Sequence, residues 1–207
     1  MEKRGLYAII VVLVITIGYL AYVLDAEKKI IRQHVNKLTE LQGMMANQSY
    51  KLENITIISK LQHYAEGRTL DNYTLYSANG DSCRLRDVCK DKKLVYYLSE
   101  QGCQTCYLPF LKRVNELADT IGKEKILVIA KFSERRAFKL FLQDLGFDLK
   151  LIVYQTRTDF DIYPEYNDYA MAFMLGQDLE IDNICITDKS NTALSGDYLK
   201  LIHFFRL

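Results

Sequence analysis

The hydrophobic positions along the chain change their period twice, and the first part is a continuous apolar run. Residues 5–24 (GLYAIIVVLVITIGYLAYVL) hold no charged side chain. A helix of that length spans roughly 30 Å, which matches the hydrocarbon core of a bilayer. The run lacks the polar face of a soluble core helix and the small residues of a signal-peptide cleavage site. It therefore predicts one uncleaved transmembrane anchor, preceded by a tail of residues 1–4.

Basic residues flank the apolar run on both sides. Lys3 and Arg4 precede it, and four more follow it: Lys28, Lys29, Arg32 and Lys37. A raw count of positive charges favours a cytoplasmic C-terminal side, because loops rich in Lys and Arg tend to stay in the cytoplasm. The short tail and the long C-terminal part reduce the weight of that count, so charge leaves the orientation open.

The second part, residues 25–65, is polar with a regular apolar repeat and is predicted to be a helical stalk. The first row of the repeat is apolar and the second is half apolar: Ile31, Leu38, Met45 and Leu52, then His34, Leu41, Gln48 and Ile55. Such heptads are typical of a coiled coil, which would make the chain a homodimer through the stalk. They also arise in an amphipathic helix that leans on the following domain, and both interpretations stay open.

From residue 66 onward, strand-like and helix-like segments alternate. β-prone runs predict strands at 93–99, 125–130, 149–154, 170–175 and 181–187, after a hairpin made of 73–77 and 83–88. Periodic apolar positions predict helices at 103–121, from a cap at Ser133 to a stop before Gly146, and at 197–205. This order predicts an α/β domain over residues 66–207, with three layers (α/β/α) around a mixed sheet.

Composition and charge narrow the classes of function. Apolar residues make up 49% of the chain and charged residues 26%, which is typical of a folded globular protein. The 27 basic and 26 acidic residues leave a formal net charge of +1, and residues 25–207 balance to zero. Without a basic excess, no nucleic-acid partner is expected.

The candidate chemistry lies in Cys103-Gln104-Thr105-Cys106, where a buried strand turns into a helix. Unpaired N–H groups and the macrodipole at a helix N-terminus favour an anion, so Cys103 is expected to be a better thiolate than an ordinary cysteine. The two sulfurs lie about one helical turn apart, the first facing solvent and the second shielded. This arrangement suits attack by Cys103 on a substrate disulfide and resolution by Cys106.

On the run KLVYYLSEQGCQTC and the order of elements after it, residues 69–207 resemble the thioredoxin superfamily. The resemblance is closest to its membrane-tethered, TlpA/ResA-like (AhpC/TSA-type) members. It implies a thioredoxin-like fold, with Cys103 as the nucleophile, Cys106 as the resolving cysteine, and no bound cofactor or metal. It also implies a single-pass membrane protein whose C-terminal domain lies on the extracytoplasmic (periplasmic) side. Protein thiol/disulfide clients and a membrane electron donor are the implied partners.

Three positions depart from the family pattern. Gly102 replaces the aromatic residue usual before the first cysteine. Tyr97 stands six residues before Cys103, where thioredoxins bury a carboxylate that takes the proton of the resolving thiol. A phenol with an ordinary pKa of about 10 is a poor base at neutral pH. The family's cis-proline has no counterpart directly before residues 170–175, since the nearest proline is Pro164.

Other interpretations of the cysteines stay open. A metal site needs about four ligands. Cys83 and Cys89 are candidates for the other two, although their six-residue spacing does not suit a compact chelating loop. The alternative function is a non-enzymatic, membrane-anchored tether with a degenerate thioredoxin fold. Cys185 lies in a β-prone run and is expected to be a core residue.

Two further features accompany the motif. The loop before residue 170 is acidic and Tyr-rich, and we expect a solvated loop rather than a cation site: Asp159, Asp161, Glu165 and Asp168, with Tyr163, Tyr166 and Tyr169. The tyrosines would either contact a client or pack the loop. Pro109, three residues after Cys106, is expected to disturb the helix.

Overall fold

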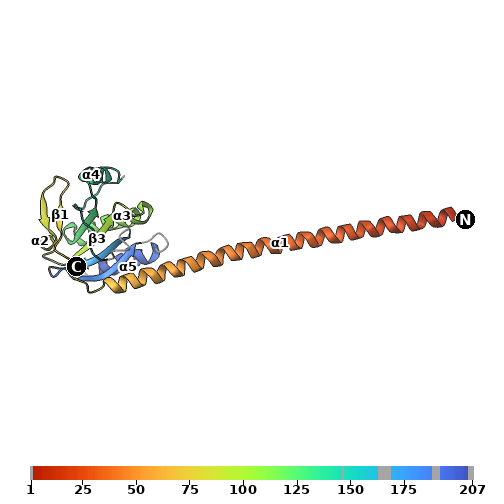
Figure 1. The fold of residues 1–207 in the computed structure, drawn as a ribbon, viewed down its shortest axis with the longest axis horizontal. Helices are drawn as coiled ribbons and strands as arrows, with labels where there is room; N and C mark the ends of the chain where they lie inside the picture. The colour runs from red at the N-terminus through yellow and green to blue at the C-terminus, as the bar shows by residue number, and fades with distance from the viewer. Residues whose placement is uncertain (1, 146, 163–168, 188–191, 205–207) are drawn as a thin grey trace. The chain divides into compact units, whose positions relative to one another are not determined.

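The computed structural model describes residues 2–145, 147–162, 169–187 and 192–204 (Figure 1). The chain divides into two compact units, residues 1–53 and 54–207. The first unit is helical, and the second contains a sheet covered by helices on both faces.

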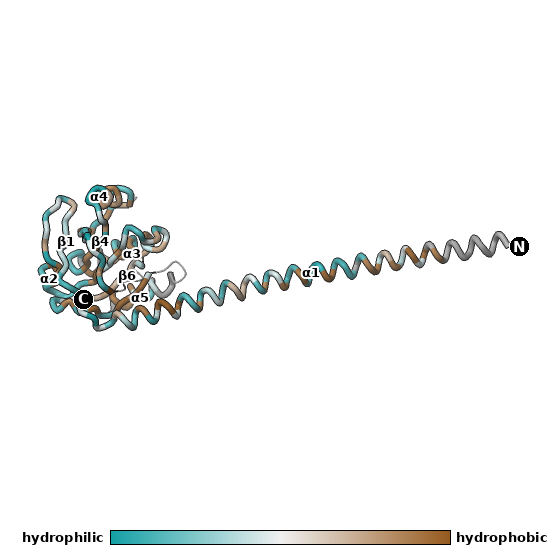
Figure 2. Tube along the Cα trace, in the orientation of Figure 1, coloured by the Kyte–Doolittle hydropathy of each residue, from teal (hydrophilic) through white to brown (hydrophobic). Residues whose placement is uncertain are grey.

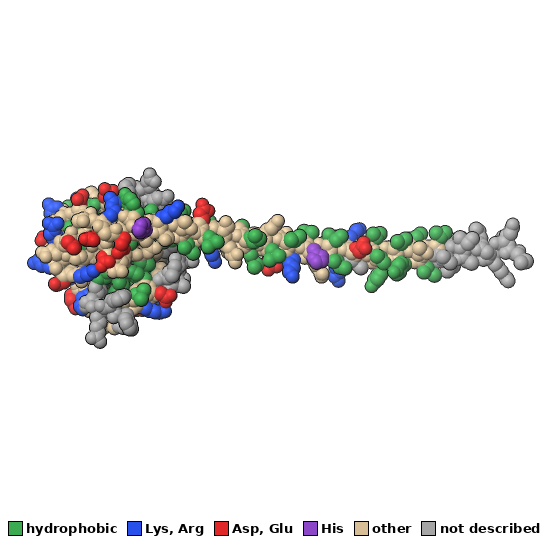
Figure 3. All heavy atoms as spheres, turned by 90° about the horizontal axis from the view of Figure 1, so that it is seen from below, with side chains coloured by type: hydrophobic (Ala, Val, Ile, Leu, Met, Phe, Trp, Pro, Cys, Tyr) green, Lys and Arg blue, Asp and Glu red, His purple; other side chains and the backbone are tan. Residues whose placement is uncertain are grey.

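Helix α1 (Glu2–Ala65) contributes to both units. Its residues up to 53 lie in the first unit, and its residues 54–65 lie in the second. No proline interrupts the helix. Four heptad residues are between 60% and 70% exposed: Ile31, Leu38, Met45 and Leu52. Hydrophobic and hydrophilic residues are interspersed along the described part of the helix (Figure 2), and Figure 3 shows hydrophobic side chains on its surface. The predicted anchor at residues 5–24 is not confirmed: none of the helices in the described part of the chain has the length and apolar character needed to cross a membrane.

Among the described residues of the second unit, seven strands form one mixed sheet. Their order is β2-β1-β5-β4-β3-β6-β7, with bounds β1 Thr74–Tyr76, β2 Ser82–Arg84, β3 Lys93–Ser99, β4 Ile126–Lys131, β5 Val153–Thr156, β6 Ala170–Leu175 and β7 Ile181–Thr187. Strand β3 pairs in parallel with β4 and antiparallel with β6, so it lies in the interior of the sheet. The predicted strands 93–99, 170–175 and 181–187 are confirmed with the same bounds, because a continuous β-prone run suits a strand covered on both faces.

Helices cover both faces of this sheet, so the three predicted layers are present. Helices α3 (Gln104–Ile121), α4 (Arg135–Gln143) and α5 (Thr192–Phe204) contribute to the core on one face. A 3-10 turn, η1 (Lys123–Lys125), follows α3. The end of α1 and helix α2 (Leu85–Val88) contribute to the core on the other face. We call these the α3-side core and the α1-side core.

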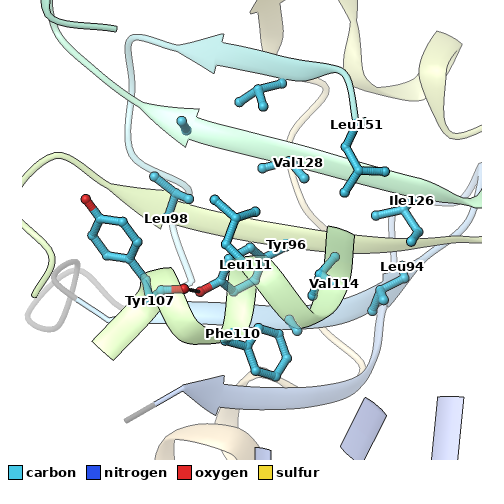
Figure 4. Close-up of a cluster of buried hydrophobic side chains, with 14 of the residues drawn as sticks. Leu94, Tyr96, Leu98, Tyr107, Phe110, Leu111, Val114, Ile126, Val128 and Leu151 are labelled. Atoms are coloured by element: carbon cyan, nitrogen blue, oxygen red, sulfur yellow. Dashed lines mark hydrogen bonds between the residues drawn. The ribbon is translucent and has the colours of Figure 1, made fainter. Parts of the chain in front are cut away.

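The two cores divide the side chains of β3 between them. Leu94, Tyr96 and Leu98 belong to the α3-side core, where Leu111 and Val114 of α3 cover them (Figure 4). The alternate residues Val95 and Tyr97 belong to the α1-side core. This follows from the strand geometry, in which successive side chains point to opposite faces.

The end of α1 packs against the sheet within the second unit. Ile58 and Ala65 are buried, and the side-chain amide of Gln62 donates to the carbonyl of Ile184 at 2.7 Å. Just after the helix, the Glu66 carboxylate accepts hydrogen bonds from the backbone N–H groups of Asn183 and Ile184. The compact unit therefore includes the last turns of the segment that the sequence predicts as a stalk.

Three local predictions are wrong. The strand predicted at 149–154 begins only at Val153, as β5. The predicted strand at 83–88 ends at Arg84, because the chain turns into helix α2 and buries Leu85 completely in the α1-side core. The N-cap of α4 is Glu134 and not Ser133. The Ser133 hydroxyl donates instead to the carboxylate of Glu100 at 2.7 Å, which leaves it unavailable as a cap.

Candidate functional site

The Cys103–Cys106 motif follows the carboxyl end of the central strand β3. The chain leaves the sheet at Ser99 through a tight turn, in which the N–H of Gly102 donates to the Ser99 carbonyl at 2.9 Å. The N–H of Glu100 donates to the carbonyl of Lys131, at the end of β4, at 3.0 Å. The predicted position of the motif, between a buried strand and a helix, is confirmed.

The two cysteines of the motif differ in exposure. Cys103 is exposed and is the N-cap residue of α3, with φ −69° and ψ 110°. Its carbonyl accepts the N–H of Cys106 at 2.9 Å and that of Tyr107 at 3.2 Å, which places the half-buried Cys106 in the first turn. An exposed thiol at a helix N-terminus with a second thiol one turn away can act as nucleophile and resolving partner.

A hydroxyl lies beside the exposed thiol. The Oγ1 atom of Thr105 is 3.0 Å from Sγ of Cys103. A hydroxyl at this distance can donate to a thiolate, and a hydrogen bond to the charged form favours that form. The spacing of the motif does not reveal this contact, because it depends on the rotamers of both side chains.

Tyr97, at the family's carboxylate position, faces away from α3. Its ring lies in the α1-side core, stacked on Phe160 with ring centroids 4.6 Å apart. Its hydroxyl donates to a carboxylate oxygen of Asp159 at 3.4 Å. Burial, and then the charge of Asp159, raise the pKa of Tyr97 well above its ordinary value. At neutral pH it is an uncharged phenol, which agrees with the prediction that it is a poor base.

The neighbouring Tyr96 is the residue that sequence reasoning missed. It lies fully buried in the α3-side core, and its hydroxyl donates to the carbonyl of Tyr107, in the first turn of α3, at 3.1 Å (Figure 4). The alternation of side chains along a strand was the available signal. It places residues 96 and 97 on opposite faces, and only one of them can share a face with the helix that follows.

A cluster of charges lies at the carboxyl ends of β3 and β4. Lys131 is 8% exposed, and its Nζ lies 3.9 Å from a carboxylate oxygen of Glu100 and 3.5 Å from one of Asp159. Sequence reasoning missed this cluster as well, although a lysine closing the apolar run ILVIAK was a signal, because a buried cation needs partners. Asp159, whose side chain is 35% exposed, therefore pairs with Lys131 while it keeps contact with solvent.

The remainder of the acidic segment is described in part. The backbone N–H of Asp161 donates to the Tyr73 hydroxyl at 3.0 Å, and Tyr169 packs, partly buried, against the α1-side core. The other predicted residues lie outside the described part of the chain: Tyr163, Pro164, Glu165, Tyr166 and Asp168. No peptide bond among the described residues is cis.

The other three cysteines lie outside the motif and are less exposed than Cys103. Cys89 and Cys185 are buried and Cys83 is half-buried, which confirms that Cys185 is a core residue. Burial raises the pKa of both Cys89 and Cys185 to about 11. Within the described residues, no group of three or more His, Cys, Asp or Glu side chains is arranged to hold a metal ion.

The raised pKa values of the buried thiols predict which cysteines an alkylating agent modifies. At pH 8, a short iodoacetamide pulse should modify Cys103 and leave Cys89 and Cys185 intact, since a pKa of about 11 leaves roughly one thiol in a thousand ionised. Burial holds the pKa of both thiols above the ordinary value of 9.0, so the stability that they contribute is complete below pH 9 and is lost as the pH rises to about 11. Mass spectrometry of the native chain checks the labelling. Equal rates at Cys103 and Cys185 would contradict it.

The connections around β3 decide the fold. β3, the cysteine motif, α3 and β4 form a parallel β-α-β unit, while β6 and β7 form an antiparallel pair on the other side of β3, followed by α5. The fold is thioredoxin-like. This confirms the predicted fold class for the sheet and its helices. In this thioredoxin-like domain, β5 and the β1–β2 pair extend the sheet beyond β4.

Comparison with known proteins finds similar solved structures. No protein-family model and no curated protein sequence matches the chain. Similar solved structures include PrxQ from Xylella fastidiosa, with 14% identity, a TM-score of 0.49 and coverage of 66% of this chain and 94% of that one. A thioredoxin-like protein from Bacteroides caccae has 16% identity, a TM-score of 0.47 and coverage of 69% and 52%. The exposed lipoprotein thioredoxin Etrx1 from Streptococcus pneumoniae has 17% identity, a TM-score of 0.41 and coverage of 63% and 98%. Likenesses at this level say nothing about activity, which depends on the residues of the site.

Proposed function

We propose that the chain is a thiol–disulfide oxidoreductase that exchanges the Cys103–Cys106 dithiol or disulfide with client proteins. One observation carries the proposal: the exposed Cys103 stands at the N-cap position of α3, and the half-buried Cys106 lies one turn further along the same helix. Unpaired N–H groups at a helix N-terminus stabilise a thiolate there, and a thiolate is the form that attacks a disulfide.

In the reducing direction, the thiolate of Cys103 attacks one sulfur of a client disulfide. The client S–S bond breaks, a mixed disulfide with Cys103 forms, and the released client thiolate takes up a proton. The deprotonated Cys106 then attacks Sγ of Cys103, which releases the second client sulfur as a thiol. The client gains two electrons and two protons, and the chain is left with a Cys103–Cys106 disulfide. The oxidising direction is the reverse.

The test is a redox titration of the full chain. The protein is equilibrated in graded dithiol/disulfide buffers, alkylated, and its Cys103–Cys106 state is read from the mass. We expect a reversible two-electron transition between roughly −120 and −300 mV, the range of catalytic thiol–disulfide couples. A pair that stays reduced throughout, or stays oxidised below this range, would contradict the proposal and favour a non-enzymatic tether.

The tethering of the domain is a separate part of the proposal. We propose that residues 5–24 hold the domain at a membrane, on its extracytoplasmic side, where disulfide-bonded clients occur. The support is the run of uncharged residues at 5–24. Resistance of the full chain to extraction from membranes by alkaline carbonate is the expected result, and complete extraction would contradict it.

A further inference from the structure

The buried hydroxyl of Tyr96 connects the central strand to the turn that carries the two cysteines. Tyr96 is 0% exposed and Tyr107 is 3% exposed, and the hydrogen bond between the Tyr96 hydroxyl and the Tyr107 carbonyl is 3.1 Å long (Figure 4). The N–H of the same Tyr107 donates to the carbonyl of Cys103 at 3.2 Å. The phenol therefore joins β3 to the carbonyl of Tyr107, the residue whose N–H bonds to Cys103.

Pro109 makes this link more important for the first turn of α3. Pro109 lies inside the helix, two residues after Tyr107. A proline has no N–H, so it cannot donate to the carbonyl four residues earlier, which here belongs to Thr105. The turn that carries Cys103 and Cys106 therefore lacks one of the bonds that normally join a first turn to the second. The Tyr96 hydroxyl supplies a bond from outside the helix.

Contacts of both its ring and its hydroxyl hold the phenol of Tyr96 in place. Its ring packs against Phe110 of α3, with centroids 5.0 Å apart. The Thr187 side chain at the end of β7 also interacts with the hydroxyl. Desolvation raises the pKa of Tyr96 far above its ordinary value, so the group is a neutral hydrogen-bond donor under all physiological conditions. The Tyr96 hydroxyl therefore gives this turn a hydrogen-bond donor that carries no charge.

We infer that Tyr96 is the positioning residue of the motif: its buried hydroxyl holds the first turn of α3 on the central strand and so keeps the Cys106 thiol within reach of Cys103. The inference rests on the proposed exchange reaction and extends it. The family's buried carboxylate lies on the same strand but has been replaced by Tyr97, which faces the other core. A hydrogen bond to the helix backbone, rather than a buried base, supports the resolving cysteine in this chain.

The experiment compares Tyr96→Phe with Tyr97→Phe, each of which removes one hydroxyl from neighbouring buried positions of the same strand. The full-length chain is equilibrated with reduced and oxidised glutathione, and the equilibrium constant for the Cys103–Cys106 disulfide is measured. Tyr96→Phe should lower it about tenfold, because the Tyr107 carbonyl loses the hydrogen bond that joins it to β3 and the turn is held less firmly. Tyr97→Phe should leave it within twofold of the unchanged chain. A purely structural role would lower the melting temperature in both variants and leave the equilibrium constant unchanged.

A second measurement does not depend on exchange activity. In a Cys103→Ser background, the rate of Cys106 modification by N-ethylmaleimide should rise about fivefold when Tyr96→Phe is added, since a loosened turn exposes the half-buried thiol. Rates within twofold of each other, or an equal increase with Tyr97→Phe, would overturn the inference. If the unchanged chain forms no Cys103–Cys106 disulfide with glutathione, the proposed function fails, and the modification rates still decide the role of Tyr96.

Discussion

Replacing Cys103 with serine is expected to reduce disulfide exchange by roughly a thousandfold or more, because the reaction begins with a thiolate that serine does not supply. Cys103 is the exposed member of the pair, so a client disulfide reaches its sulfur first. The assay is the reduction of insulin disulfides by the full chain in the presence of a thiol reductant. The rate at which turbidity develops measures the effect. The rate should fall to that of the reductant alone.

The partner variant separates the two roles. Cys106→Ser should still attack and then accumulate a mixed disulfide, because nothing resolves it. The adduct should appear as a higher-mass species that a reductant removes. Cys83→Ser is the matched control, since this half-buried thiol lies in β2, outside the motif, and its loss should leave the rate unchanged. A Cys103→Ser chain that keeps more than a tenth of the rate would show that the pair does not carry the reaction.

Truncating Phe160 to alanine is expected to lower the free energy of unfolding of the second unit by about 3–5 kcal/mol. The ring is 2% exposed and lies between two others, with its centroid 4.6 Å from that of Tyr97 and 4.7 Å from that of Tyr73. Its removal leaves a cavity in the α1-side core and also loses two aromatic contacts. Because the chain has 15 tyrosines and no tryptophan, unfolding in urea is followed by tyrosine fluorescence and near-ultraviolet circular dichroism.

The control for this prediction is Leu140→Ala in α4. Leu140 is 49% exposed, so its truncation should change the free energy of unfolding by less than about 1 kcal/mol. The Phe160 variant should also move Asp159, which precedes it, away from Lys131. A loss below about 1 kcal/mol for Phe160→Ala would mean that residues 157–162 do not cover the sheet.

The fold was accessible from the sequence where a local pattern and the tertiary environment agree. The run KLVYYLS predicts a buried strand at residues 93–99, and β3 has those bounds. The apolar spacing after Cys103 predicts a helix at residues 103–121, and α3 ends at Ile121, followed by Gly122 at φ +96°. Such a φ suits glycine, so the local signal and the helix end coincide.

Local patterns failed where a distant contact decided the conformation. Apolar and polar residues alternate over 83–88 as they would in a strand. The chain nevertheless forms the short helix α2 there, and this helix buries Leu85 in the core. Ser133 looks like a helix cap, but the Glu100 carboxylate, 33 residues earlier, takes its hydroxyl. In both cases the competing partner lies far away in the sequence, and no local propensity contains it.

The sequence by itself determined the position of the cysteine pair at a strand-to-helix junction, the central strand before it, the helix after it and the mixed α/β class. These depend on the period of apolar residues and on backbone stops, which are properties of short segments. The tertiary structure alone decided that the Tyr96 hydroxyl bonds to the Tyr107 carbonyl, that Lys131 pairs with Asp159, and that the end of α1 packs on the sheet. These are contacts between residues far apart in the chain. They form because burying a hydroxyl or a charge requires a partner, and only the folded chain brings that partner close.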